Sequence, residues 1–135
     1  MVSEGQKKIL YVDDDADDRE FFSEAIKDGN PSTNIVFAEN GLEALDYLNS
    51  VLNTRSNLPC LIVLDLNMPL LDGKETFQRI KRNERLQNVP IVIFTSSNKP
   101  ADKDLFNSHG IEFITKPTNF QFMKNIANHM LNHCP

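Results

Sequence analysis

The chain has 135 residues, of which 40% are hydrophobic and 24% charged, and its formal net charge is −5 at pH 7. A chain of this length can enclose one hydrophobic core, so we expect a single domain over residues 1–135 with its core at about 8–131. No apolar run approaches the roughly 20 residues that a membrane span needs. No stripe of lysine and arginine is interleaved with aromatic residues, so we expect neither nucleic acid nor a membrane as a partner.

The two cysteines, Cys60 and Cys134, have neither the spacing of a metal site nor that of a disulfide framework. We therefore expect both to be reduced thiols in a cytoplasmic protein. The polar start of the chain is too short for a signal peptide, which agrees with that location.

Short apolar runs alternate with segments of helical period along the whole chain, which predicts βα units and a parallel sheet. Several of the runs are apolar at nearly every position, as in strands that are covered on both faces. The predicted fold is an α/β, doubly wound (βα)5 three-layer sandwich. Its strands are expected at residues 8–12, 35–38, 61–64, 91–94 and 112–115.

Five helices fit between and after these strands, and cap residues mark several of their ends. Asn40 and Asp72 each precede a helical segment and are followed three residues later by a glutamate, which is typical of a helix start. The first helix is expected at about 16–28, and Pro100 lies in the first turn of a weaker fourth helix. In the fifth, one of Phe120 and Phe122 is expected to face the core, and the other is a candidate contact residue.

In doubly wound sheets, ligands bind at the carboxyl ends of the strands. The residues that follow the predicted strands are therefore the most informative. Taken singly, each has a structural explanation: an aspartate or threonine often forms a turn or cap, and a lysine is usually solvated. Asp15, Asp17 and Asp18 fit the first turn of a helix, where the macrodipole favours acids. The residues at the strand ends are Asp13, Asp14, Asp65, Thr95, Ser96 and Lys116.

Taken together, these residues bring three carboxylates, a hydroxyl and an ammonium to one edge of the sheet. Three carboxylates at one place need a cation, and a site with only oxygen ligands favours Mg²⁺, with Mn²⁺ as a substitute. A lysine and a threonine hydroxyl are suitable partners for a phosphoryl group. The pattern predicts phosphoryl transfer onto an aspartate.

Four stretches, ILYVDDDADD, LIVLDLNMPLLDG, VPIVIFTSS and EFITKP, occur in this order. With them, the chain resembles the receiver domain of the response-regulator family of bacterial two-component systems, over nearly all of its length. The resemblance implies the flavodoxin-like strand order 2-1-3-4-5 and a stand-alone receiver with no output domain.

The partner that the resemblance implies is a sensor histidine kinase or a histidine phosphotransfer protein. Among kinases, a phytochrome-like or hybrid kinase is one candidate. The output would pass to an unknown downstream protein, or to a homodimer formed through the helix 4–strand 5–helix 5 face. The chain would then be no enzyme beyond its own phosphorylation and dephosphorylation.

The resemblance also assigns roles to individual residues. Asp65 matches the phosphoacceptor. Asp13 and Asp14 match the acidic pair that holds Mg²⁺ together with Asp65, with Asp14 as the direct ligand. Asn67 matches the position whose backbone carbonyl binds the metal.

The remaining roles concern switching. Thr95 matches the hydroxyl that turns toward the phosphoryl group, and Lys116 matches the ion-pairing lysine, with a cis bond expected before Pro117. Phe113 matches the aromatic switch position, although chemotaxis-type members have tyrosine there. Ser96 stands where alanine or glycine is common.

Three alternatives remain open. One is a receiver fold that acts as an interaction module without phosphorylation. Another is a haloacid-dehalogenase-like phosphatase, because Asp13 and Asp15 follow a strand with that motif's spacing; however, that class needs a late acidic pair, and no acid follows Lys116. A flavin mononucleotide binder shares the architecture but lacks here a phosphate loop after the first strand.

Overall fold

The protein is described by a computed structural model that covers residues 7–54 and 57–134. Its sheet has five parallel strands in the order β2-β1-β3-β4-β5. The expected doubly wound fold and strand order are confirmed. The strands are β1 Lys8–Val12, β2 Asn34–Ala38, β3 Leu61–Leu64, β4 Ile91–Thr95 and β5 Glu112–Thr115.

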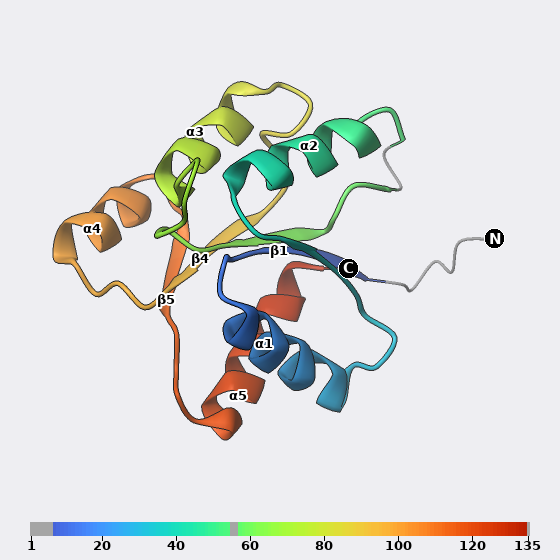
Figure 1. The fold of residues 1–135 in the computed structure, drawn as a ribbon, viewed down its shortest axis with the longest axis vertical. Helices are drawn as coiled ribbons and strands as arrows, with labels where there is room; N and C mark the ends of the chain where they lie inside the picture. Colours follow the sequence, from blue (N-terminus) through green and yellow to red (C-terminus); the bar gives the residue numbers. More distant parts are fainter. Residues whose placement is uncertain (1–6, 55–56, 135) are drawn as a thin grey trace.

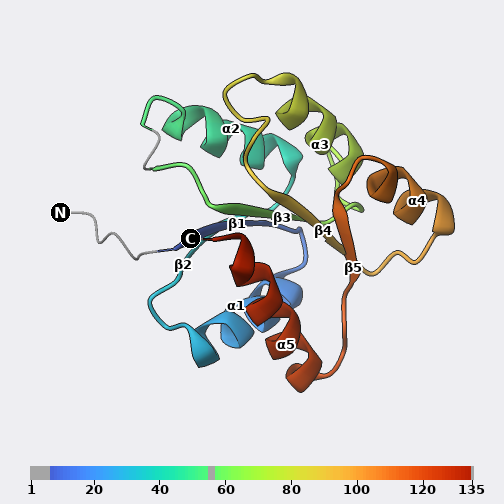
Figure 2. The ribbon, with the colours of Figure 1, turned by 180° about the vertical axis from the view of Figure 1, so that it is seen from behind.

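The helices cover both faces of the sheet, so the domain has three layers (Figure 1). Helices α1 and α5 lie on one face, and α2, α3 and α4 lie on the other, as the view from behind also shows (Figure 2). The helices are α1 Ala16–Gly29, α2 Gly41–Val51, α3 Gly73–Arg82, α4 Pro100–Ser108 and α5 Phe120–Met130, followed by the 3-10 turn η2 Leu131–His133.

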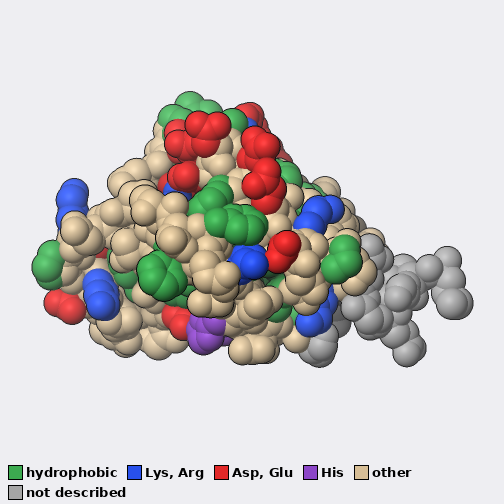
Figure 3. Space-filling model, turned by 90° about the horizontal axis from the view of Figure 1, so that it is seen from below, with side chains coloured by type: hydrophobic (Ala, Val, Ile, Leu, Met, Phe, Trp, Pro, Cys, Tyr) green, Lys and Arg blue, Asp and Glu red, His purple; other side chains and the backbone are tan. Residues whose placement is uncertain are grey.

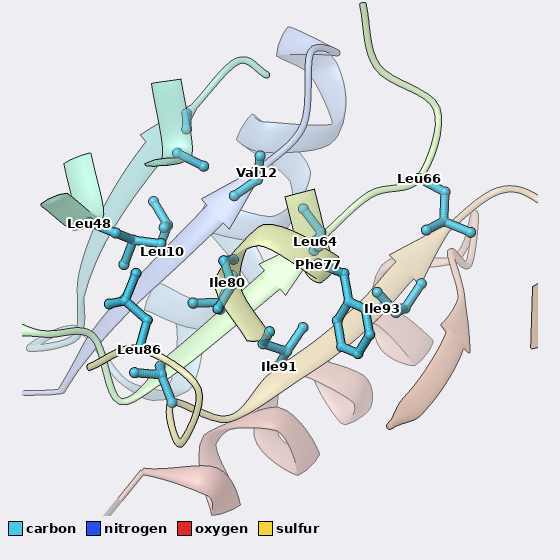
Figure 4. Packing of buried hydrophobic residues seen from close by; sticks show 14 of the residues in the cluster. Leu10, Val12, Leu48, Leu64, Leu66, Phe77, Ile80, Leu86, Ile91 and Ile93 are labelled. Carbon is cyan, nitrogen blue, oxygen red and sulfur yellow. The ribbon is translucent and has the colours of Figure 1, made fainter. Parts of the chain in front are cut away.

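Each central strand contributes to two hydrophobic cores because successive side chains of a strand point to opposite faces. In β1, Leu10 and Val12 pack under α2 and α3, whereas Ile9 and Tyr11 pack under α1 and α5. Figure 4 shows the first of these cores, in which Phe77 and other side chains of the helices meet the strands. The apolar runs predicted as covered strands are therefore buried on both sides.

The predicted caps are present. The Asn40 side chain accepts a hydrogen bond from the backbone N–H of Glu43 at 2.9 Å, and Asp72 accepts one from Glu75 at 2.9 Å. Helix α1 is capped by Asp15, which accepts from two backbone N–H groups of the first turn. Helix α4 differs, since it begins with Pro100 and has no side-chain cap on its N-cap residue.

The expectation of two reduced thiols is wrong, because Cys60 and Cys134 are joined in a disulfide. Cys60 directly precedes β3 and Cys134 directly follows η2. The return of the chain through α5 brings their Cα atoms to 5.1 Å, within bonding range. Their separation of 74 residues gives no sign of this proximity in the sequence.

The expectation for the two phenylalanines of α5 is also wrong in part. Neither faces the core: Phe120 is 38% exposed and Phe122 is 63% exposed. The Phe120 ring lies 5.8 Å from that of Phe21 on α1, and Lys124 lies over its face. Figure 3, which views the molecule from below, shows apolar side chains in the middle of the visible surface. The core positions of α5 are taken instead by Met123, Ala127 and Met130.

None of the helices in the described parts of the chain combines the length and apolar character that crossing a membrane requires.

Candidate functional site

The carboxyl ends of β1 and β3 place two acids side by side. Val12 and Leu64 are partners in the parallel register, so the next residues, Asp13 and Asp65, emerge together at the same edge of the sheet. The backbone N–H of Asp65 donates to the carbonyl of Val12 at 3.0 Å, which fixes this relationship. Both aspartates are buried.

Lys116, which follows β5, supplies the positive charge between these acids. Its ammonium lies 2.6 Å from Asp13, 2.8 Å from Asp18 and 3.2 Å from Asp65. Burial lowers the pKa of this lysine, but hydrogen bonds to Asp13 and Asp18 and the charge of Asp65 outweigh it, so its pKa is raised above the usual value. The ammonium is therefore charged throughout the neutral range.

Hydrogen bonds fix both carboxylate oxygens and the backbone carbonyl of Asp13. One carboxylate oxygen accepts the backbone N–H of Asp15 at 3.0 Å, and the other accepts the hydroxyl of Tyr11 at 3.1 Å as well as Lys116. The Arg19 guanidinium donates to its backbone carbonyl at 2.9 Å. Burial and then the charge of Asp13 raise the pKa of Tyr11, so this phenol stays protonated and remains a donor.

Asp65 has a different environment from Asp13. One of its oxygens accepts the backbone N–H of Leu66 at 2.8 Å, and the other faces Lys116. Burial raises the pKa of this carboxyl; Lys116 and the Thr95 hydroxyl lower it, and the charge of Asp13 raises it again, with a net upward shift. The ionised form is thus partly destabilised, as expected for a group that a cation or a covalent change would relieve.

Carboxylate oxygens of Asp13, Asp14 and Asp65 lie within 4.8 Å of one another. Asp14 is exposed, whereas the other two are buried, so the group is open to solvent on one side. A donor set of carboxylates without histidine or cysteine fits a hard divalent cation such as Mg²⁺ or Mn²⁺. Asn67 is exposed in the loop after β3, and the role of its carbonyl as a ligand stays a prediction.

Thr95 is the last residue of β4 and is fully buried, and its hydroxyl oxygen accepts the backbone N–H of Ser97 at 3.2 Å. Ser96 is exposed beside it. Phe113 lies in β5 opposite Ile93, and its half-buried ring is 6.3 Å from that of Phe106 in α4. The candidate switch residues therefore lie on β4 and β5, next to α4.

The cis bond expected before Pro117 is absent, since the described residues contain no cis peptide bond. Lys116 reaches its carboxylate partners from a trans arrangement, so the ion pairs do not require the cis form. A trans bond is also the preferred state of a bond before proline, by about 0.5–1 kcal/mol.

Gly73 lets helix α3 begin in close contact with the backbone of Asp65. A Cβ atom at this glycine would lie 2.1 Å from the Asp65 carbonyl oxygen and 2.7 Å from the Leu66 Cα. Only glycine permits this approach. The start of α3 is thereby packed directly against the backbone of the buried aspartate.

Two residues of the site were not predicted from the sequence. Asp18 was interpreted only as a first-turn acid of α1, yet it also contacts the Lys116 ammonium. Its place three residues after the cap was a usable signal, because side chains of a helix lean toward the helix start. Tyr11 was interpreted only as part of an apolar strand, although its hydroxyl needs a partner when buried.

Comparison with known proteins places this geometry in a family. Residues 9–128 match the model of the response regulator receiver domain. The chain is 31% identical to the response regulator Rcp1 of Synechocystis over 119 residues, covering 85% of this chain and 80% of Rcp1. It is 35% identical over 91 residues to the "Probable methanogenesis regulatory protein FilR2" of Methanothrix harundinacea, covering 67% of this chain and 59% of that protein.

Solved structures give the same result. The phosphorylated cyanobacterial phytochrome response regulator RcpA has a TM-score of 0.80 at 31% identity, covering 97% of this chain and 98% of RcpA. The Mn²⁺-bound form of Rcp1 has a TM-score of 0.79 at 27% identity, covering 93% of this chain and 92% of that one. The acids and the lysine at the strand ends thus lie in a known fold, and the chain belongs to the response regulator receiver family of two-component systems.

Proposed function

We propose that this protein is a phosphoacceptor that receives a phosphoryl group on Asp65. One observation carries the proposal: the Asp65 carboxylate meets two further carboxylates and the Lys116 ammonium at the carboxyl edge of the sheet. An oxygen of Asp65 attacks the phosphorus of a phosphohistidine, the P–N bond breaks, and the imidazole leaves with its electron pair and takes up a proton. The aspartate becomes an acyl phosphate.

Asp13, Asp14 and Asp65, with the carbonyl of Asn67, would hold a divalent cation, which we propose to be Mg²⁺. When bound, the cation supplies charge neutralisation to the phosphoryl oxygens. The chain's own groups do the rest. Lys116 offers its ammonium to the phosphoryl oxygens, and Asp13, held by Tyr11, keeps the lysine in place.

Switching is proposed to begin when Thr95 moves and vacates the space beneath it. Its hydroxyl turns toward the phosphoryl group, and the ring of Phe113 moves inward. Phosphorylation then shifts an existing equilibrium between two states. Phe113 has no hydroxyl, so any such contact made by a tyrosine is absent here.

The phosphodonor is proposed to be a sensor histidine kinase or a histidine phosphotransfer protein. RcpA, one of the similar structures, is named as a phytochrome response regulator, which supports a phytochrome-like kinase as one candidate. Output is proposed through the surface of α4, β5 and α5, to another protein or a second copy. Leu105 and Phe122, exposed on α4 and α5, provide apolar contact area there. Light scattering before and after phosphorylation would detect a dimer.

The central test uses acetyl phosphate as the donor, with and without Mg²⁺, and reads intact mass. We expect one phosphoryl adduct that requires Mg²⁺ and is absent from Asp65→Asn. The matched control is Asp46→Asn, which changes an exposed acid of α2 and should leave the adduct unchanged.

Other outcomes would contradict the proposal in distinct ways. No adduct under any condition would favour an interaction module without phosphorylation. An adduct that persists in Asp65→Asn would place the acceptor elsewhere, and Asp13 would be tested next. Turnover of a phosphomonoester would instead favour a phosphatase.

A further inference from the structure

The structure contains one buried acid that the proposed phosphoryl chemistry does not use. Asp102 lies in the first turn of α4 and is only 7% exposed. Its oxygen Oδ1 lies 2.6 Å from the Lys74 ammonium, and its oxygen Oδ2 accepts the Ser97 hydroxyl at 3.3 Å. The hydrogen bond from Lys74 holds the pKa of Asp102 below its usual value, so the pair is ionised at neutral pH.

Ser97 links Asp102 to Thr95, the proposed switch residue. Its backbone N–H donates to the Thr95 hydroxyl oxygen at 3.2 Å, and its own hydroxyl oxygen accepts the N–H of Lys99 at 3.4 Å. Since Ser97 N–H occupies one lone pair of the threonine oxygen, it restricts the orientation of that buried hydroxyl. Asp102 fixes Ser97, and Ser97 fixes Thr95.

The ion-pair partner of Asp102 also lies close to the site. Lys74 follows Gly73, the glycine that packs directly against the Asp65 carbonyl. The ion pair with Asp102 therefore joins the start of α3, behind the proposed phosphoacceptor, to the start of α4. The N-cap residue of α4 provides no side-chain cap, so the contacts of Ser97 and Asp102 order this end of the helix.

We propose that Asp102 is a positioning residue which, through Ser97, holds the Thr95 hydroxyl in the orientation seen here, with Lys74 holding Asp102 in place. The proposal rests on the proposed function of Asp65. A threonine that turns toward a phosphoryl group must give up the hydrogen bond from Ser97. The ion pair between α3 and α4 therefore opposes the change, and weakening the pair should make phosphorylation faster.

The first test compares Asp102→Asn and Lys74→Gln with the control Asp104→Asn, which alters an exposed acid of the same helix. We expect acetyl phosphate with Mg²⁺ to phosphorylate both variants about fivefold to tenfold faster than the native chain. The double variant should be no faster than either single one, and the control should match the native chain. Unchanged rates in both single variants would overturn the proposal.

A second comparison asks whether the effect passes through Thr95. In a Thr95→Val background, which removes the hydroxyl but keeps the shape, Asp102→Asn should have no further effect on the rate. An acceleration that persists in this background would overturn a role exerted through the threonine. A general loss of structure would not produce this dependence on one hydroxyl.

A third measurement needs no phosphodonor. Hydrogen exchange of the Ser97 amide should become about tenfold faster in Asp102→Asn and Lys74→Gln, and stay unchanged in Asp104→Asn. Unchanged exchange would overturn the positioning role, whether or not the native chain is phosphorylated. Faster exchange in a protein that forms no adduct would instead contradict the proposed function alone. Should Asp102→Asn not fold, Lys74→Gln, whose side chain is 46% exposed, carries all three measurements.

Discussion

The ammonium of Lys116 lies 2.6 Å from the carboxylate of Asp13, although 103 positions separate the two residues in the chain. It also contacts Asp18 and Asp65, so a single cation serves acids from three segments. The folded chain thus supplies its own positive charge where the strand ends would otherwise gather only negative charge.

Replacing this lysine should cost much more stability than replacing a surface lysine. Lys116→Gln leaves Asp13, which is 0% exposed, and Asp65 without their partner. Breaking a buried pair in this way typically costs about 3–5 kcal/mol in the free energy of unfolding, measured by urea denaturation at neutral pH. Lys124→Gln breaks the more exposed pair with Asp28 and should cost less than about 1 kcal/mol. Equal losses would show that the Lys116 contacts contribute no more to the free energy of unfolding than the pair of Lys124 and Asp28.

Asp65→Asn should be more stable than the native chain at pH 7 in the presence of a chelator. Burial raises the pKa of Asp65 in the folded state above its unfolded value. The folded state then binds this proton more tightly, so the stability from this group is present below the unfolded pKa of roughly 3.9 and is lost as pH rises through the folded pKa. Thermal unfolding across this range should show the advantage of the variant appearing as pH rises. A variant less stable at pH 7 would contradict this account.

The ion pair of Lys74 and Asp102 should show the opposite dependence on pH. The pKa of Asp102 is lowered, chiefly by the hydrogen bond from Lys74, so its contribution to stability is present above the unfolded pKa and is lost as pH falls through the lower folded value. Lys74→Gln should therefore be less stable than the native chain at neutral pH, and the two should converge in acid below roughly pH 4. Urea denaturation at several pH values measures this, and a constant difference would exclude the ion pair as its cause.

Gly73→Ala should disturb the site through the backbone. The added Cβ would lie 2.1 Å from the Asp65 carbonyl oxygen, so either α3 or Asp65 must move. Overpacking of this kind costs about 1–3 kcal/mol, and we expect weaker Mg²⁺ binding as well, measured by calorimetry. Gly29→Ala is the control, because its Cβ would meet no atom closer than 3.7 Å. Native metal affinity in Gly73→Ala would mean that the site tolerates this shift.

Reduction of the disulfide should lower the stability of the protein. A bond that closes a loop between residues 74 positions apart restricts the unfolded chain, and the chain-entropy account gives about 4 kcal/mol. Urea denaturation with and without a reducing agent measures this. The double variant Cys60→Ser with Cys134→Ser should not respond to the reductant, and a native chain that also does not respond would indicate that the bond does not form in solution.

Features determined by neighbouring residues could be predicted from the sequence. The strands were within one residue of their observed bounds because each is an apolar run between turn residues, and Asn40 and Asp72 cap helices because the cap bond is local. Asp13, Asp14 and Asp65 could be grouped because parallel strands end at one edge. Their proximity is confirmed, whereas their chemical roles remain proposals.

Features determined by the packing of distant elements could not be predicted in this way. The approach of Cys134 to Cys60 depends on how α5 returns along the sheet, and the second role of Asp18 depends on where Lys116 reaches. Phe122 was expected to compete with Phe120 for the core, but the rotation of α5 leaves both exposed. The cis bond was inferred from resemblance alone, and no local signal in the sequence distinguishes the two isomers.

The bond between Cys60 and Cys134 also divides the chain into a closed loop and an open segment. Pulling on the two ends of the oxidised chain can extend only the residues before Cys60 and the single residue after Cys134, at most about 210 Å in contour at roughly 3.5 Å per residue, against about 470 Å for the reduced chain. Asp65, Thr95 and Lys116 lie inside the loop, whereas Asp13 lies outside it. Mechanical force would therefore draw the first strand and its acids away from a segment that the bond keeps from being stretched.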